Sequence, residues 1–476
     1  TDRPFSSWVT GKKGAVMQAA DETGLRQEHP ATSLTDDPVG QGSWNRRVWR
    51  LTIPMILSNV TVPLLGAVDT AVMGHLPNPA FIGAVAVAAM VFSYIYWSFA
   101  GFLRMGTTGF TAQAKGAGNL VELRAILARA VLLGGIISLL ILALQAPIAW
   151  LAFSLVDASA EVTDLARSYF FIRIWGAPAT LASYGLLGWL LGLGQVRAIL
   201  LLQLLTNGAN IALNLLFVLG LGMAVEGVAL ATLLAEYLSL AVGLLFVTRQ
   251  LARHPAPWRT EVILSAERLR TTLKVNADII IRSFCLTTGF AVFTTLSARM
   301  DDVTLAANAV LGNLLSIISY GLDGFAHAAE ILVGRAVGER NPKHLSAAVQ
   351  TSSAWALVTA LLLSLLFWIF GPALLTLFTN QPATLATAER YLPWMTLLPV
   401  IAVAAYQLDG IFIGATRTGA MRNAMIFSLL AYLAVAWLLV PAWGNNGLWL
   451  SLTFFLGARG VTLLMAYPAL RRALFA

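Results

Sequence analysis

Residues 48–74 read VWRLTIPMILSNVTVPLLGAVDTAVMG, and this stretch decides the fold. A helix of about 20 mainly apolar residues crosses the hydrocarbon core of a bilayer, and the stretch exceeds that length. Similar runs fill most of the 476-residue chain, which is 58% apolar and only 11% charged, against about 25% charged in soluble domains. We therefore expect an all-α polytopic membrane protein without a large soluble catalytic domain.

Short polar breaks divide the chain into twelve expected transmembrane helices. Lys and Arg gather at one set of helix ends, so the positive-inside rule places both termini in the cytoplasm and requires an even number of spans. The same distribution explains the formal net charge of +8, which therefore does not indicate nucleic-acid binding. The expected spans are residues 48–74, 80–113, 121–153, 162–192, 196–219, 224–249, 269–297, 303–335, 344–378, 384–414, 419–440 and 444–470.

An internal repeat relates the two halves of the chain. The motif QAKGAGN at residues 113–119 resembles RAVGERN at residues 335–341, and Gly116 and Gly338 within these motifs lie 222 positions apart (338 − 116). Such a duplication predicts two pseudo-symmetric six-helix lobes of one orientation, related by an axis along the membrane normal. The same offset joins Tyr169 to Tyr391, Tyr184 to Tyr406, Gly188 to Gly410 and Gly192 to Gly414.

The longest polar break lies between the sixth and seventh spans and divides the lobes. We expect an N-lobe at residues 47–250, a cytoplasmic linker at 251–268 and a C-lobe at 269–476. Residues 1–46 are polar and lack helical periodicity, so we expect a disordered tail, within which Met17 is an alternative start.

Motifs of soluble enzyme chemistry are absent from the sequence. It contains no Walker A sequence, no zinc-binding H-E-x-x-H and no G-x-S-x-G elbow. Its one cysteine, Cys285, cannot form an internal disulfide. We therefore expect no enzyme activity, no metal and no cofactor, and transport that is passive or driven by an ion gradient.

The strongest functional candidate is Asp69, an ionisable residue deep in the first span. Charged groups inside apolar spans are costly to bury and mark ion or substrate pathways by default. We predict that Asp69 carries the coupling proton, and the alternative is a structural cap of a broken helix near the outer surface. Pro54 removes a backbone donor from the same helix and is the predicted hinge.

The fifth span carries four amide side chains at spacings of three and four, which place them on one helix face. An amide both donates and accepts, so this face could bond a carboxyl group in either protonation state. The alternative is a set of structural hydrogen bonds between helices. The four residues are Gln203, Asn207, Asn210 and Asn214.

In the second half, Asp323, His327 and Glu330 follow one another at i, i+4 and i+7 and share a helix face. This arrangement suits a proton relay or a cation site. The favoured alternative is a buried structural network with Arg335 or a helix end at the cytoplasmic interface. Asp409 is a further candidate carboxylate inside a span.

Other charged residues within spans are expected to compensate one another. Asp278 and Arg282 lie one turn apart, which predicts an ion pair within one helix. Arg104, Arg173 and Arg459 are expected to neutralise carboxylates. If Arg173 faces the cleft between the lobes, anionic amphiphiles remain an alternative class of substrate.

Three segments carry a family resemblance: RLTIPMILSNVTVPLLGAVDTAVMGHL at 50–76, FLRMGTTGFTAQAKGAGN at 102–119, and LLGWLLGLGQVRAILLLQLLTNGANIALNLLFVLGLGM at 186–223. They resemble the MATE (multidrug and toxic compound extrusion) transporters, most of all the DNA-damage-inducible F (DinF) branch, and the resemblance extends from about residue 46 to the C-terminus. It implies a monomer with two six-helix lobes around a central cavity, in a bacterial inner membrane. The implied activity is export of organic, often cationic amphipathic compounds by antiport.

The resemblance also implies roles for particular residues. The first-helix aspartate and bending proline of the family fall on Asp69 and Pro54, and the implied coupling ion is H+, with Na+ less favoured. Asn214 stands where archaeal members carry an aspartate, which argues against a site with two carboxylates. The polar cluster of the N-lobe falls on Tyr169, Asn210, Asn214 and Thr232.

A second functional class stays open, a flippase for lipid-linked saccharides of the wider superfamily. Its cavity should be basic in order to hold a pyrophosphate. The candidates in the N-lobe are one carboxylate and neutral amides, which disfavours this alternative.

Overall fold

The computed structural model describes residues 41–74, 80–154 and 159–475, with the side chains at 41–42, 62–74 and 97–100 left out. The predicted tail therefore lies largely outside the described residues, as does Met17. Within the described ranges the chain is helical and contains no strand, and nine of its helices are long and apolar enough to cross a membrane. The prediction of an all-α polytopic membrane protein is confirmed.

The described residues form sixteen helical segments, of which α10 lies in the expected linker and the other fifteen build the twelve expected spans. The span at 121–153 is formed by α4 and α5, and the span at 162–192 by α6, η2 and α7. The segment α15 covers the last two spans as two helices that meet at a kink at Gly444, where the backbone is not helical and φ is 55°. The segments are α2 Gln41–Gly74, α3 Ala80–Gly116, α4 Leu120–Ala143, α5 Gln145–Ser154, α6 Ala160–Arg173, η2 Ile174–Gly176, α7 Ala177–Gly192, α8 Val196–Asn214, η3 Leu215–Gly220, α9 Val225–Arg253, α10 Thr260–Ile263, α11 Ala266–Ala298, α12 Asp302–Gly338, α13 Pro342–Leu375, α14 Pro382–Gly414 and α15 Thr418–Phe475.

The first helix begins earlier than the sequence predicts. Residues 41–46 were expected to belong to the tail, but α2 starts at Gln41. Trp44 is buried and its ring meets that of His344 edge-on, with centroids 5.6 Å apart. The reason is that this aromatic contact with α13 supports a turn of helix that hydrophobic periodicity alone does not indicate.

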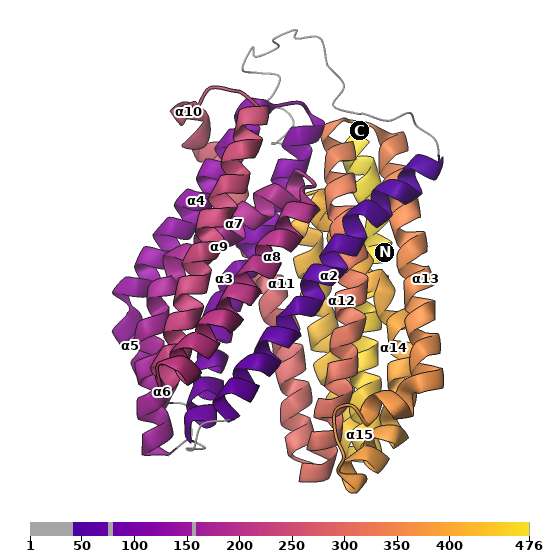
Figure 1. Cartoon of the computed structure of the whole chain (residues 1–476). Coiled ribbons are helices and arrows are strands. Elements are labelled where there is room, and N and C mark those ends of the chain that lie inside the picture. Colours follow the sequence, from indigo (N-terminus) through magenta and orange to yellow (C-terminus); the bar gives the residue numbers. More distant parts are fainter. Residues whose placement is uncertain (1–40, 75–79, 155–158, 476) are drawn as a thin grey trace.

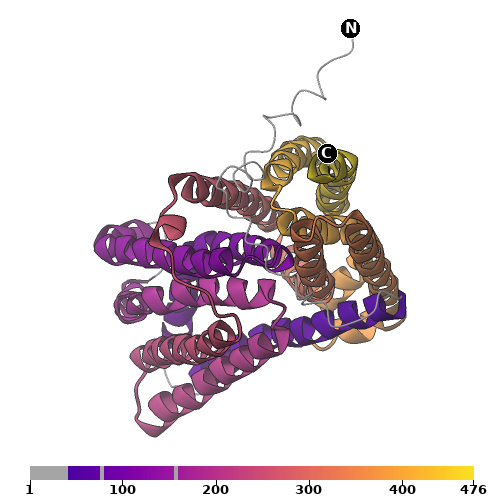
Figure 2. The same ribbon diagram turned by 90° about the horizontal axis from the view of Figure 1, so that it is seen from above.

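The helices form two groups that share two long members. In Figure 1, α3 to α9 gather on one side and α12 to α15 on the other, and Figure 2 shows α2 running from one group to the other. Helix α2 contacts α8 in its own half and α12 in the other, while α11 contacts α15 in its own half and α3 in the other. The first helix of each half therefore packs against the other half as well as against its own.

Backbone conformation repeats between the two halves at the offset found in the sequence. The described residues with positive φ fall into three pairs, each separated by 222 positions. They are Gly118 (67°) with Arg340 (52°), Gly194 (73°) with Thr416 (53°), and Gly222 (68°) with Gly444 (55°). Arg340 and Thr416 thus adopt a conformation that favours glycine because their half makes the same turn.

The repeated motifs also start equivalent helices. Asn119 caps α4 by accepting a hydrogen bond from the Glu122 backbone N–H at 2.9 Å. Asn341, its equivalent, caps α13 by accepting from the backbone N–H groups of Lys343 and His344 at 3.0 and 3.2 Å. An asparagine N-cap satisfies donors that the helix itself leaves free, which explains why each motif ends in this residue.

Glycines make the same close contacts in both halves. A Cβ on Gly116 would lie 2.2 Å from the Arg335 carbonyl oxygen, and a Cβ on Gly338 would lie 2.0 Å from the Gln113 carbonyl oxygen. These two contacts cross between α3 and α12, so they join the lobes. Equivalent contacts within the lobes pair Gly188 with Arg104, Gly410 with Ala326, Gly192 with Thr108 and Gly414 with Glu330.

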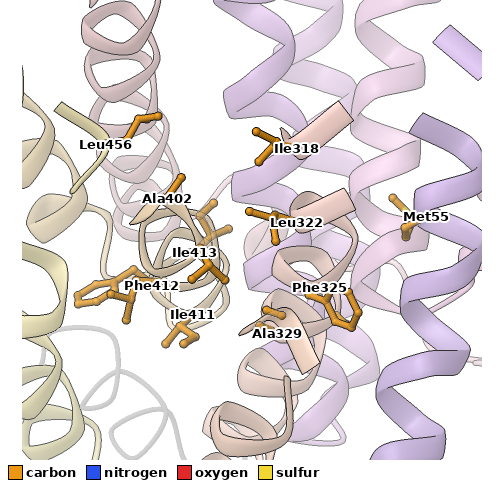
Figure 3. Packing of buried hydrophobic residues seen from close by; sticks show 14 of the residues in the cluster. Met55, Ile318, Leu322, Phe325, Ala329, Ala402, Ile411, Phe412, Ile413 and Leu456 are labelled. Atoms are coloured by element: carbon orange, nitrogen blue, oxygen red, sulfur yellow. The ribbon is translucent and has the colours of Figure 1, made fainter. Parts of the chain in front are cut away.

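The apolar core is continuous across α12 and α14. Ile318, Leu322 and Phe325 of α12 lie in one buried cluster with Ile411 and Ile413 of α14 (Figure 3). An α-helix forms its backbone hydrogen bonds within itself, so these helices meet the requirement that a lipid environment imposes on buried polar groups.

Candidate functional site

Amide side chains tie α8 to α2. Asn207 donates from Nδ2 to the hydroxyl oxygen of Thr61 at 2.9 Å and to its carbonyl oxygen at 3.3 Å. Gln203, one turn earlier, donates to Asn207 Oδ1 at 3.2 Å. Two of the four predicted amides therefore form a ladder that ends on the first helix.

The other two amides connect α8 to α9. Asn214 donates to Asn210 Oδ1 at 2.8 Å, and Asn210 donates to the Thr232 hydroxyl at 3.2 Å. Thr232 in turn donates to the Val228 carbonyl oxygen at 3.0 Å. Asn210 and Asn214 are buried, so this chain of hydrogen bonds satisfies groups that water cannot reach.

Asp69 lies within α2, but its side chain is outside the described part of the structure. The backbone nevertheless gives its level. Helices α2 and α8 meet at Thr61 and Asn207, and both run away from the end of the molecule that carries α10. Residue 69 is eight positions beyond Thr61, and Asn214 is seven beyond Asn207, so at about 1.5 Å per residue they reach almost the same level.

A π-helix marks this region of α8. The π-helix η3 begins directly after Asn214 and replaces the regular α-helical hydrogen bonds from Leu215 to Gly220. Such π segments are frequent at functional sites.

The predicted hinge, Pro54, lies nearer the other end of α2. The helix passes through Pro54 without a break, and the Pro54 side chain is partly exposed. A hinge at Pro54 therefore stays a prediction.

Tyr169 belongs to a different cluster from the amides. Its hydroxyl oxygen accepts a hydrogen bond from Arg173 Nη1 at 3.1 Å, and Arg173 Nη2 lies 3.6 Å from Glu236 Oε1. The Arg173 guanidinium also covers the Phe92 ring at 4.7 Å from its centroid. Sequence reasoning missed Glu236, although a carboxylate inside the apolar span 224–249 was a visible signal.

Asp409 is held by two buried arginines. Arg282 of α11 and Arg459 of α15 both donate to Asp409 Oδ2, and all three side chains are buried. A carboxylate already shared by two guanidinium groups is a poor ligand for a further cation, so the geometry gives no support to a cation site at Asp409.

The predicted ion pair between Asp278 and Arg282 is wrong. Asp278 accepts hydrogen bonds from Arg422 Nη1 at 2.6 Å and from the Thr418 hydroxyl at 3.0 Å. Arg282 binds Asp409 instead. Neighbouring helices offer each of these residues a better-placed partner than the residue one turn away.

The face of Asp323, His327 and Glu330 is only partly connected. His327 Nδ1 lies 3.4 Å from Glu330 Oε2, whereas Asp323 interacts electrostatically with Arg104, Arg282, Arg459 and His327. The residues that the structure describes contain no group of three His, Cys, Asp or Glu that could hold a metal ion.

The alternative prediction, a structural network between this helix face and Arg335, is wrong. Arg335 donates to the Leu193 carbonyl oxygen at 2.8 Å, and Lys115 donates to the same oxygen at 2.9 Å. Gln113 donates to the Gly414 carbonyl oxygen at 2.9 Å. These bonds join the two halves at the end of the molecule where α10 lies, here called the linker end, because Arg335 and Gln113 each reach a helix terminus of the opposite half.

Comparison with known proteins agrees with this duplicated arrangement. The MatE family model matches residues 54–216 and 279–438, once in each half. The chain belongs to the MatE family. It is 43% identical over 423 residues to DNA damage-inducible protein F of Escherichia coli K12, covering 88% of this chain and 91% of that protein.

More distant MatE relatives share the fold. The chain is 29% identical over 459 residues to a probable multidrug resistance protein NorM of Caulobacter vibrioides, covering 92% of this chain and 93% of that protein. A solved multidrug resistance MATE family transporter in an outward-facing conformation superposes with a TM-score of 0.81 at 21% identity, covering 90% of this chain and 96% of that one. The chain is thus a multi-pass member of a family of multidrug efflux transporters.

Proposed function

We propose that this chain exports organic, often cationic amphipathic compounds across the bacterial inner membrane by antiport with H+. The supporting observation is the register between α2 and α8, which brings residue 69 and Asn214 to one level beside a buried chain of amides. In this proposal the linker end and both termini are cytoplasmic, and the transporter works as a monomer.

The amide chain suits a carboxyl group that changes its protonation state. An ionised carboxylate only accepts hydrogen bonds, whereas a protonated one also donates. Asn210 and Asn214 carry both donors and acceptors, so they can rearrange around either form without leaving a buried group unsatisfied. Asp69 then binds the proton or interacts with a cationic substrate, but not both at once.

The proposed cycle follows from this competition. With the transporter open to the outside, protonation of Asp69 removes the charge that retains the cation, α2 bends at Pro54, and the substrate leaves. The lobes then rearrange, and deprotonation toward the cytoplasm restores the site. Each proton supplies about 1.4 kcal/mol per pH unit, plus about 2.3 kcal/mol per 100 mV if net charge moves.

Two alternatives are less well supported. Sodium coupling would favour a second carboxylate beside Asp69, yet position 214 is an asparagine that bonds Asn210. A lipid-linked saccharide flippase would need a strongly basic cavity, yet Arg173 faces Glu236, and Arg282 is shared with Asp409.

The test is efflux of a cationic dye from proteoliposomes across an imposed pH gradient, with and without Na+. We expect the Asp69→Asn variant to lose proton-driven efflux, while Asp164→Asn, a matched change at an exposed position of α6, keeps it. Unimpaired efflux in Asp69→Asn would refute the coupling role. Efflux that needs Na+ and ignores the pH gradient would refute the choice of ion.

A further inference from the structure

Glu236 is a largely buried carboxylate of α9 that the proposed cycle does not use. Its Oε1 lies 3.6 Å from Arg173 Nη2, whereas its Oε2 is buried and has no hydrogen-bond partner. Oε2 packs against Gly176, where a Cβ would lie 2.0 Å from it. A buried acceptor without a donor is costly, most of all when it carries charge. A proton on Oε2 would remove that cost.

The buried carboxylate of the second half is held much more firmly. Arg282 and Arg459 both donate hydrogen bonds to Asp409 Oδ2. Charge-assisted N–H···O bonds are about 2.7–2.9 Å long, so the 3.6 Å separation of Glu236 from Arg173 is an ion pair without such a bond. A proton would have to displace two donors at Asp409, but none at Glu236 Oε2.

Arg173 has partners that remain when Glu236 is neutral. Its Nη1 donates to the Tyr169 hydroxyl oxygen at 3.1 Å. Its guanidinium lies 4.7 Å from the centroid of the Phe92 ring and 5.8 Å from that of the Tyr169 ring. Aromatic faces attract a cation, so protonation of Glu236 does not leave Arg173 without compensation.

The other groups that face Glu236 are neutral. Tyr96 of α3 and Tyr184 of α7 interact with it electrostatically, and Thr180 of α7 lies beside it. Tyrosine hydroxyl groups carry no charge near pH 7. Among the described residues, Arg173 is the ion-pair partner of Glu236, so the gain or loss of a proton changes the balance with this one charge.

Glu236 also follows the amide chain along α9. The chain runs from Asn214 through Asn210 to Thr232, and Glu236 is four residues beyond Thr232, on the same helix face. Four residues correspond to about 6 Å along the helix axis. The chain therefore starts at the level of residue 69 and ends one turn from a second carboxyl group.

We propose that Glu236 is a second proton-binding residue, so that each cycle exchanges two protons for one monovalent cationic substrate. With the transporter open to the outside, a proton binds to Glu236 Oε2 and the ion pair opens, while Arg173 stays with Tyr169 and Phe92. The proton later leaves toward the cytoplasm and the ion pair re-forms. The inference rests on the proposed export function, because it adds one proton to the cycle of Asp69.

The experiment measures how many protons exchange for one cation, with the full chain in proteoliposomes. The probe is radiolabelled ethidium, a permanently monovalent cation, and the measured quantity is the opposing ethidium gradient at which net flux stops. With the membrane potential held at zero, a pH gradient of one unit balances an ethidium gradient of about tenfold for each proton exchanged. We expect flux to stop at about 100-fold in the wild type and at about tenfold in Glu236→Gln.

The membrane potential gives an independent readout. At equal pH, exchange of two protons for one cation moves one net charge, so about 60 mV balances an ethidium gradient of about tenfold in the wild type. Exchange of one proton moves no net charge, so Glu236→Gln should not respond to the potential. A merely structural role would slow the flux without moving either balance point, because a balance point does not depend on the rate.

Two further variants complete the design. Arg173→Gln removes the counter-charge of Glu236, and an uncompensated carboxylate is costly to bury in its ionised form. Glu236 should then hold its proton throughout the cycle, and flux should stop at about tenfold, as in Glu236→Gln. Glu389→Gln, a matched change at an exposed position of α14, should stop at about 100-fold like the wild type.

The proposal is overturned if flux in the wild type stops at about tenfold or ignores the potential. It is also overturned if Glu236→Gln or Arg173→Gln keeps the 100-fold balance point. A wild-type balance point of about tenfold leaves proton antiport intact, since Asp69 alone would then carry the proton. Absence of any pH-driven flux in the wild type would overturn both this inference and the proposed function.

Discussion

Replacing Gly338 with Ala should open the linker end. A Cβ at this position would lie 2.0 Å from the Gln113 carbonyl oxygen and 2.8 Å from its carbonyl carbon. Real Cβ atoms keep at least about 3.0 Å from such atoms, so α3 and α12 must separate by about 1 Å. Two other contacts join the halves beside this one: Gly116 packs against Arg335, and Arg335 donates to the Leu193 carbonyl oxygen. The same separation would lengthen both.

The size of the effect follows from the cost of overpacking. Forcing extra carbon into a closed contact costs about 1–3 kcal/mol, which shifts a two-state equilibrium by roughly 5- to 150-fold. Only the arrangement with a closed linker end carries this cost. The variant should therefore populate an arrangement in which α3 and α12 are separated at the linker end. The natural control is Gly312→Ala in the same helix, where a Cβ would meet nothing within 4 Å.

The assay is the distance between spin labels across the linker end, measured by double electron–electron resonance. Labels attached through cysteines at Arg197 and Arg417, both exposed, report on opposite halves after Cys285 is replaced by Ala. Gly338→Ala should broaden the distribution and move it to longer distances, whereas Gly312→Ala should match the wild type. A Gly338→Ala distribution that superposes on the wild type would refute the contact as a determinant of closure.

Two further predictions concern stability. Asp409→Asn should lower the free energy of unfolding by about 3–5 kcal/mol, because Arg282 and Arg459 lose their shared counter-charge; an unchanged Tm in detergent would contradict the pairing. The Thr304 hydroxyl and backbone N–H, which donate to Asp301, lower the pKa of this carboxyl. Its stabilisation is therefore present above the unfolded-state pKa and lost as pH falls through the lower folded-state pKa. The Tm of the wild type should accordingly drop more on acidification than that of Asp301→Asn, and parallel curves would contradict this.

The fold could be predicted because it depends on local and repeated features. Apolar length predicted the spans, and the motifs around Gly116 and Gly338 predicted the duplication, since close helix contacts tolerate only glycine there. Partner choice could not be predicted in the same way. Spacing along one helix suggested that Asp278 pairs with Arg282, but α14 and α15 bring Asp409 and Arg422 closer, and sequence separation does not reveal such contacts.

The sequence predicted which residues belong to the candidate site better than it predicted which of them bond one another. The one-face spacing of the amides led to the residues that form the ladder from Gln203 to Thr61. It did not indicate that Tyr169 bonds Arg173 and stands apart from them. The roles of Asp69 and Pro54 stay predictions, and only their positions along α2 enter the argument.

The two halves share their backbone but not their chemistry. The turns with positive φ and the glycine contacts repeat at an offset of 222 (338 − 116), so the backbone scaffold of the two halves is closely duplicated. The polar side chains are not duplicated, because the positions equivalent to the amide ladder are Met425, Leu429, Tyr432 and Ala436. Conversely, the positions equivalent to Arg282, Asp409 and Arg459 are Val60, Leu187 and Tyr237.

The two halves therefore carry different polar groups on similar backbones. The chain of amides that runs from Asn214 through Asn210 to Thr232 lies in the first half, and its groups can hydrogen-bond a carboxyl group in either protonation state. The arginine pair on Asp409 lies only in the second half, where two guanidinium groups share one buried carboxylate.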